Sequence, residues 1–151
     1  MAKKRTRTWY INKLFDKAKK YVKERDNYIC QYSGKKVSGS NCHCSHVLNR
    51  GHYAHAALDP FNMKTLSSYY HLHWWHKDVL HSSLWFRQKF PDRYDYLMIL
   101  AQEKKKIPTL ALEQLHENTK ADGSDYAEQY FLTLEDLNER VKKEQQQQIL
   151  L

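Results

Sequence analysis

The sequence is poor in the residues that mark several common classes of protein. It has only three cysteines and four glycines among 151 residues, which excludes a disulfide framework and a glycine-rich phosphate loop. No apolar run approaches the roughly 20 residues of a membrane span, and no apolar segment follows the basic start, as a secretory signal would require. Hydrophobic residues make up 41% of the chain, which is typical of a globular protein. We therefore expect one soluble domain in a reducing compartment, without a membrane partner.

Acidic residues are scarce in the first third of the chain. Residues 1–50 carry 13 lysines and arginines against 3 aspartates and glutamates, a net charge of +10. Residues 51–151 carry 12 against 14, a net charge of −2. This asymmetry favours a polyanionic partner on the N-terminal side, and nucleic acid fits it somewhat better than anionic lipid or an acidic protein.

Histidines are concentrated in one segment, since eight of the nine lie between His43 and His81. Imidazole is the commonest metal ligand and the acid–base group that titrates near neutral pH, so the clustering indicates a site. The alternative is a set of half-buried histidines in an aromatic core. Five aromatic residues of the same segment support that alternative: Tyr69, Tyr70, Trp74, Trp75 and Trp85.

Apolar periodicity and turn residues predict an α+β fold that is mainly helical. The expected helices cover residues 9–25, 66–79, 83–90, 94–105, 109–116 and 133 onward. Short strands at 28–32 and 41–47 are expected to form a hairpin, followed by a loop over 49–60. Residues 1–7 are expected to be a disordered basic arm, residues 8–106 the main domain with its basic first helix, and residues 107–151 an acidic helical extension.

Three polar residues, spaced along the predicted hairpin, loop and helix, can surround one small cavity. His46 ends the second strand, Asn62 lies in the loop or at the helix entrance, and His71 lies on the helix. This arrangement suits metal-assisted hydrolysis of a phosphodiester. A neutral histidine takes a proton from water, a cation neutralises the phosphate, and the asparagine amide braces the loop or orients the histidine.

The residues around these three resemble a known group of nucleases. Residues 25–36 resemble the opening of HNH (ββα-metal) endonucleases, and residues 43–51, His-Cys-Ser-His-Val-Leu-Asn-Arg-Gly, are similar to the His-x-Gly-His-Tyr-x-Ser-Arg-Gly of the phage NinG (Rap) recombination nucleases. The family's next segment has an asparagine, a cysteine five residues later, a cysteine eight later and an asparagine or histidine nine later. The matching positions here are Asn62, Ser67, Tyr70 and His71. The resemblance covers roughly residues 20–105.

The resemblance implies a small ββα-metal (HNH) hairpin-helix unit embedded in a mainly helical single domain. It implies a metal-dependent DNA endonuclease that acts on branched recombination intermediates in a phage or prophage setting, in the cytoplasm of a bacterial host. One divalent cation, Mg²⁺ or Mn²⁺, is the expected cofactor, and the oligomeric state stays open, a dimer included. The implied roles are His46 as general base, Asn62 as brace, His71 as metal ligand and Arg50 as phosphate contact. His43, in place of the missing aspartate, and His76 are further candidate metal ligands. The basic charge adds candidate DNA contacts at Lys13, Lys17, Lys20, Lys35 and Lys36.

Two departures from the family pattern leave alternatives open. The family holds a structural zinc with four cysteines, but the matching positions here are Cys30, Ser33, Ser67 and Tyr70, so we expect no structural zinc. Ser45 stands where many HNH enzymes have an aspartate ligand. A non-catalytic DNA-binding or recombination accessory protein with a degenerate HNH frame is therefore a second interpretation. An HNH nuclease for homing or restriction is a third, which the lack of an appended DNA-reading module weakens.

Overall fold

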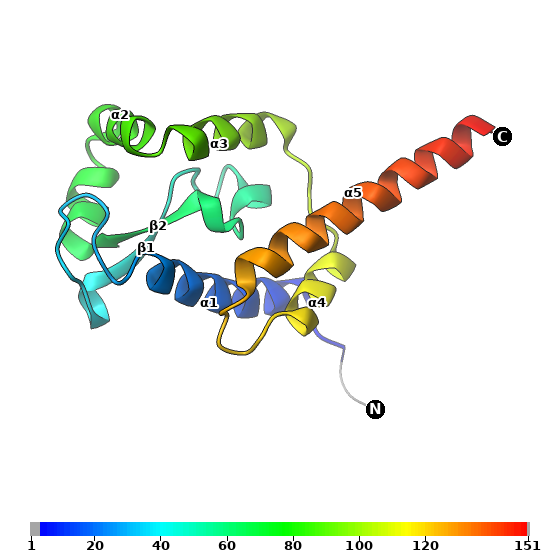
Figure 1. Cartoon of the computed structure of the whole chain (residues 1–151), viewed down its shortest axis with the longest axis horizontal. Helices are drawn as coiled ribbons and strands as arrows, with labels where there is room; N and C mark the ends of the chain where they lie inside the picture. Colours follow the sequence, from blue (N-terminus) through cyan, green and yellow to red (C-terminus); the bar gives the residue numbers. More distant parts are fainter. Residues whose placement is uncertain (1–3, 151) are drawn as a thin grey trace.

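The computed structural model describes residues 4–150, with side chains through residue 148 (Figure 1). The fold class is α+β, mainly helical, as predicted. Its larger elements are α1 (Arg7–Arg25), β1 (Cys42–His46), β2 (Met63–Ser67), the π-helix η4 (Tyr70–Trp75), α2 (Val79–Lys89), α3 (Pro91–Glu103), α4 (Thr109–Asn118) and α5 (Tyr126–Leu150). Three short 3₁₀ turns, η1 (Gly39–Asn41), η2 (Ala54–Ala56) and η3 (Pro60–Asn62), lie in the connections.

The sheet consists of β1 and β2, paired antiparallel with His46 opposite Met63 and His43 opposite Leu66. The predicted strand at 41–47 is confirmed, but its partner was predicted wrongly. Residues 28–32 form only one isolated bridge, between Ile29 and Lys36. Asn27 and Tyr28 have φ of 56° and 54°, and these left-handed conformations turn the chain where a strand would need extended backbone.

The predicted helix over 66–79 is also wrong at its start, because β2 extends to Ser67. All five residues of β2 are buried, so its sequence lacks the apolar–polar alternation that announces a half-exposed strand. The chain then enters η4, and α2 begins at Val79, earlier than the predicted start near Ser83. The order is therefore strand, long connection over 47–62, strand, and π-helix.

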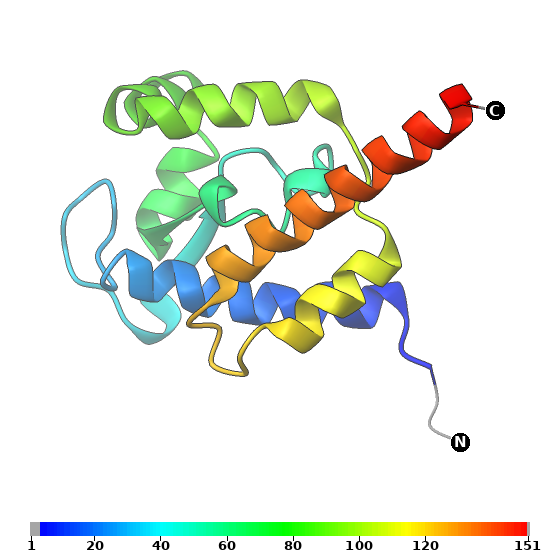
Figure 2. The same cartoon turned by 45° about the vertical axis from the view of Figure 1, so that its right-hand side comes forward.

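Two hydrophobic cores lie on either side of the strands. In Figures 1 and 2, α2 and α3 run along one edge of the molecule and α1 and α4 along the other, with the strands and the 47–62 connection between them. Leu14, Ala18 and Val22 of α1 are fully buried against α4 and α5. The second core joins β1, η4, α2 and α3 around Leu66 and Phe86.

The C-terminal helices share a core with α1 rather than standing apart from it. Tyr126 and Tyr130 of α5 are buried in the same cluster as α1, which explains why α5 begins at Tyr126. The predicted start at Thr133 is wrong, because its hydroxyl donates to the carbonyl oxygen of Gln129 within the helix. The helices predicted near 9–25, 94–105 and 109–116 are confirmed as α1, α3 and α4.

The predicted basic arm, residues 1–7, lies partly outside the described residues. At its end, the Thr6 side chain caps α1 by accepting from the amide of Trp9, and the Arg7 guanidinium donates to the carbonyl oxygen of Ile107. The start of α1 is thereby tied to the segment that precedes α4. Among the described residues, no helix is long and apolar enough to cross a membrane.

Candidate functional site: a histidine-lined cavity

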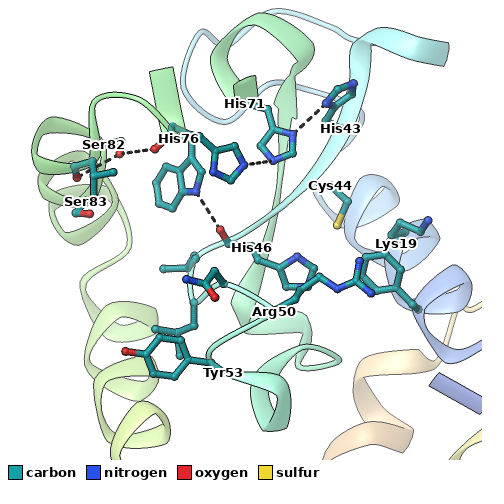
Figure 3. A pocket seen from close by; sticks show the side chains of 16 residues that line it. Lys19, His43, Cys44, His46, Arg50, Tyr53, His71, His76, Ser82 and Ser83 are labelled. Atoms are coloured by element: carbon teal, nitrogen blue, oxygen red, sulfur yellow. Dashed lines mark hydrogen bonds between the residues drawn. The ribbon is translucent and has the colours of Figure 1, made fainter. Parts of the chain in front are cut away.

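A cavity of about 640 Å³ opens between α1, β1, the loop after β1, η4 and the start of α2 (Figure 3). Four histidines line it: His43, His46, His71 and His76. In Figure 3, His43, His71 and His76 lie in a row on one side, and His46 and Arg50 lie across from them. Among the described residues that line the cavity none is acidic, so imidazole nitrogens and cationic groups dominate its chemistry.

His46 is held as a neutral imidazole with a defined tautomer. Its Nε2 lies 2.8 Å from the carbonyl oxygen of Ala57, which can only accept, so Nε2 carries the proton and Nδ1 keeps its lone pair. The ring stacks on Phe15 of α1, with centroids 5.5 Å apart. Burial, reinforced by the positive charges of Arg50 and Lys64, lowers the pKa of His46 to about 4. At neutral pH this side chain can accept a proton.

The other three histidines form a hydrogen-bonded chain. His43 Nε2 lies 3.0 Å from the carbonyl oxygen of Ser40, so Nε2 is the donor and Nδ1 of His43 is the acceptor. His71 Nδ1, 3.0 Å away, must then donate to it, which leaves Nε2 of His71 to accept from Nε2 of His76 at 3.0 Å. Burial, followed by repulsion from His76 and His43, lowers the pKa of His71 to about 4. The ring of His71 is therefore neutral at pH 7.

The π-helical form of η4 brings His71 and His76 together. In an α-helix, residues five apart point in different directions, whereas the i→i+5 bonding of a π-helix places them one above the other. The amide of His76 bonds to the carbonyl oxygen of His71, and both rings line the cavity. His73, on the same helix, is exposed and contacts Tyr69 instead.

Asn62 is completely buried and braces the connection between the strands. Its Oδ1 accepts from the amide of Leu48 at 2.7 Å, and its Nδ2 donates to the carbonyl oxygens of Leu48 and Ala56 at 3.1 and 3.0 Å. The side chain thus ties the chain just after His46 to the η2 turn, next to the Ala57 carbonyl that holds His46. Asn62 does not line the cavity itself.

Side chains from three helices clamp the η3 turn that carries Asn62. Arg25 of α1 donates to the carbonyl oxygens of Pro60 and Met63, and Arg93 of α3 donates to those of Phe61 and Met63. Asp59 caps the turn by accepting from the amide of Phe61. The hydroxyl of Tyr96 in α3 donates to the Asp59 carboxyl group, and the hydroxyl of Tyr126 in α5 donates to the carbonyl oxygen of Leu58. Burial raises the pKa of Asp59 to about 6.

Ser45 does not face the cavity. It is fully buried and pairs with Lys64 across the sheet, and the Lys64 ammonium donates to its hydroxyl at 3.2 Å. The same Nζ lies 3.2 Å from the ring centroid of Trp75. Burial, then repulsion from Arg93, lowers the pKa of Lys64 well below its ordinary value. The position at which the resembled family often has an acidic ligand is therefore occupied by a serine–lysine contact.

The cationic residues predicted to bind DNA fall into different environments. Arg50 lines the cavity, with its guanidinium 4.3 Å from the Phe15 ring centroid, and Lys13, Lys20, Lys35 and Lys36 are exposed. Lys17 has another role, because its Nζ donates to the carbonyl oxygens of His116 and Thr119 at the end of α4. Lys19 belongs to the basic helix but was not singled out as a site residue, and it lines the cavity four residues after Phe15, one turn further along α1.

The four positions that match the family's zinc-binding cysteines come together in space. Polar groups of Ser33, Tyr32 and Ser67 lie around the Cys30 sulfur, and the amide of Tyr70 donates to the Ser67 hydroxyl. Burial raises the pKa of the Cys30 thiol, but the polar groups around it outweigh burial, so the pKa lies below its ordinary value. One thiol and neutral polar groups occupy this turn.

No group of three or more histidine, cysteine, aspartate or glutamate side chains in the described part of the chain is arranged to hold one metal ion. The histidine chain shows why, since His71 directs Nδ1 at His43 and Nε2 at His76, and one ion cannot bind both nitrogens of a ring. Comparisons with protein-family models, curated proteins and solved structures gave no match to this chain.

Proposed function

We propose that this protein is a divalent-metal-dependent DNA endonuclease of the HNH type. The observation that carries the proposal is His46, whose Nε2 is bound to the Ala57 carbonyl and whose Nδ1 lone pair is left for a proton, in one cavity with the His43–His71–His76 chain. The order of strand, long connection, strand and helix supports it as well, because it is the order of the ββα-metal unit that the sequence resembles.

In this proposal His46 is the general base. A water molecule at Nδ1 would lose its proton to the ring as the oxygen attacks the phosphorus atom of a DNA phosphodiester. Arg50 lies across the same cavity and would contact a phosphate oxygen through its guanidinium. Asn62 acts indirectly, because its side chain holds the backbone of Leu48 and Ala56 in place around the His46 ring.

The histidine chain suggests how a cation would be held. His71 would offer its Nε2 atom, and His76 would offer its own once its ring proton has moved from Nε2 to Nδ1, while His71 keeps its Nδ1–H bond to His43 and His43 keeps its bond to Ser40. Metal-binding histidines usually donate their second N–H in this way. When bound, a cation would neutralise the phosphate and the leaving oxygen. Imidazole donors without a carboxylate suit Mn²⁺ better than Mg²⁺.

The distribution of charge supports DNA as the substrate. Between Asp26 and Asp78 the only acidic residue is Asp59, and it is fully buried. The surface formed by this segment therefore has no carboxylate to repel phosphates, and Arg50, Lys19 and the exposed lysines of α1 lie beside it. A branched recombination intermediate in a phage or prophage, in a bacterial cytoplasm, is the specific setting suggested by residues 43–51.

A nuclease assay tests the proposal. Purified protein with Mn²⁺ or Mg²⁺ should cleave DNA, and a four-way junction should be cut faster than a linear duplex of the same sequence. His46→Ala should lower the cleavage rate by about 10²–10⁴-fold, the usual contribution of a general base, while DNA binding persists. Equal rates for the variant and the unmodified protein would refute the assignment of His46.

The second candidate is a DNA-binding or recombination accessory protein that keeps the frame without catalysis. The contact between Ser45 and Lys64 favours it, because a buried hydroxyl bonded to a lysine stands at the position where many HNH enzymes have a carboxylate ligand. The same assay separates the two candidates. DNA binding without cleavage in any divalent metal, and without loss of affinity in His46→Ala, would establish the accessory role.

A further inference from the structure

Tyr70 and Trp74 of η4 belong to an aromatic cluster outside the lining of the cavity. Tyr32, from the loop before β1, stacks on Trp74 with ring centroids 3.9 Å apart and planes 30° from parallel. Tyr32 also contacts Tyr70 at 4.8 Å and Trp85 of α2 at 5.5 Å. The cluster thus joins three separate parts of the chain beside the histidine-bearing helix.

Two rings of this cluster remain open to solvent. Tyr32 is 41% exposed and Tyr69 is 62% exposed, although both contact Tyr70, Tyr69 at a centroid distance of 5.2 Å. Packing accounts for the covered parts of Tyr32, since the cluster lies next to the turn of Cys30 and Ser33. It does not account for Tyr69, whose ring adds apolar surface to the exterior without filling a core.

The surroundings of Tyr32 are cationic. Lys35 and Lys36 follow Tyr32 in the same loop and are exposed. Lys89 of α2 donates to the carbonyl oxygen of Gln31, next to Tyr32, and its Nζ lies 5.7 Å from the Trp85 ring centroid. Residues 27–77 contribute no exposed carboxylate to this surface, because Asp59 is buried.

We propose that Tyr32 and Tyr69, with Lys35, Lys36 and Lys89 beside Tyr32, bind unpaired bases of a single nucleic-acid strand. Exposed aromatic rings stack on bases of any sequence, and neighbouring cations bind the phosphates between them. A duplex hides the faces of its bases, so these rings favour a strand that is locally unpaired. This inference rests on the proposed function and narrows its substrate to DNA with a single-stranded segment, bound next to His71, the neighbour of Tyr70 in η4.

Binding can be measured apart from cleavage, by fluorescence anisotropy in EDTA with labelled oligothymidylate. The sharpest comparison is an abasic strand of the same length, which keeps every phosphate and lacks the bases. The unmodified protein should bind oligothymidylate about tenfold more tightly than the abasic strand, as stacking contributes roughly 1–3 kcal/mol per base. Equal affinities for the two strands would overturn the proposal.

Variants locate the effect. Tyr69→Ala and Tyr32→Leu should each reduce the preference for bases over the abasic strand, whereas Tyr69→Phe should keep it because the ring is retained. Leu110→Ala, at a 67% exposed position on α4, is a control that should change nothing. The proposal fails if Tyr32→Leu lowers the melting temperature while Tyr32→Leu and Tyr69→Ala both keep the preference for bases. The cluster would then serve packing alone.

These experiments distinguish a failure of this inference from a failure of the nuclease proposal. His46→Ala tests cleavage and is expected to leave the base preference intact, because His46 does not touch the cluster. A protein that prefers bases over abasic sites and never cleaves DNA would refute the endonuclease and keep the single-strand site. A protein that cleaves duplex DNA but shows no preference for bases would support the endonuclease and refute the single-strand site.

Discussion

His71 in the π-helix η4 and His76, which caps the end of that helix, lie five residues apart and bring their Nε2 atoms to 3.0 Å from each other. On an α-helix this spacing would separate them, and the helix would instead pair His71 with residues three or four positions away. The π-helix thus selects which histidines can share a cation. It excludes His73, which lies closer in sequence but points at Tyr69.

This arrangement predicts the order of effects on metal dependence. His71→Ala and His76→Ala should raise the Mn²⁺ concentration for half-maximal cleavage most, because each removes a proposed ligand. His43→Ala should raise it about 10–100-fold, the usual effect of losing a residue that orients a ligand. His73→Ala is the matched control and should change it little. A larger effect of His73 than of His76 would contradict the proposed ligand pair.

The pKa of His46 gives a prediction that needs no DNA. Burial is the main reason that its pKa is lowered to about 4. The ring therefore stays neutral, and able to act as a base, at pH values where an ordinary histidine, with a pKa near 6.5, is protonated. An NMR titration of the His46 ring should find its midpoint near pH 4. Phe15→Ala uncovers the ring and should move the midpoint upward, while Phe15→Leu should move it less. A midpoint near 6.5 in the unmodified protein would contradict the buried geometry.

Asp59 predicts a change of stability with pH. Burial raises its pKa from 3.8 to about 6 in the folded chain, so between these values the folded state holds a proton that the unfolded state has lost. The contribution of Asp59 to the free energy of unfolding should therefore fall as the pH rises from about 4 to 6 and level off above. Asp59→Asn removes this dependence. Urea denaturation across this pH range should show that the difference in free energy of unfolding between the unmodified protein and Asp59→Asn changes with pH. A difference that stays constant with pH would exclude the raised pKa of Asp59.

Lys17 and its neighbours on α1 should separate stability from DNA binding. Lys17 donates to two carbonyl oxygens at the end of α4, so Lys17→Met should lower the free energy of unfolding by about 1–3 kcal/mol. Reversing Lys13, Lys19 and Lys20 to glutamate should instead weaken binding to all DNA sequences alike. Each lost phosphate contact lowers the salt slope of affinity by about 0.9. An unchanged slope would remove α1 from the interface.

The Cys30 turn predicts a fold that does not depend on zinc. One thiol, Cys30, and the neutral side chains of Ser33, Ser67 and Tyr70 occupy the positions where the resembled family has four thiolates, and hydroxyls are poor zinc ligands. Elemental analysis should find well under one zinc per chain, and the circular dichroism spectrum should persist in EDTA while cleavage stops. Stoichiometric zinc together with unfolding on chelation would show that Cys30, Cys42 or Cys44 joins the histidines in another site.

Local patterns in the sequence were sufficient for several helices. The stripe of Leu14, Ala18 and Val22, the proline at the start of α3 and the threonine at the start of α4 each act within a few residues, so α1, α3 and α4 could be predicted from the chain alone. The α+β class followed from the same signals. The concentration of histidines between His43 and His81 and the scarcity of acidic residues likewise need no tertiary structure to be seen.

Tertiary structure decided the elements whose signal is not local. The five residues of β2 are buried on both faces, so no alternation marks them, and their pairing with β1 across a 16-residue connection depends on the clamps from Arg25, Arg93 and Tyr96. The start of α5 was decided in the same way, because burial of Tyr126 against α1 outweighed the local capping pattern at Thr133.

The sequence alone therefore determined which residue types are available for chemistry, and tertiary structure decided which of them meet. His43, His46, His71 and His76 line one cavity because β1 and a π-helix converge there, and the i→i+5 geometry of that helix cannot be read from a residue pattern. Ser45 and Lys17 have partners that the sequence does not reveal, for a related reason. Strand pairing faces Ser45 with Lys64, and the packing of α1 on α4 gives Lys17 two carbonyl oxygens to bind.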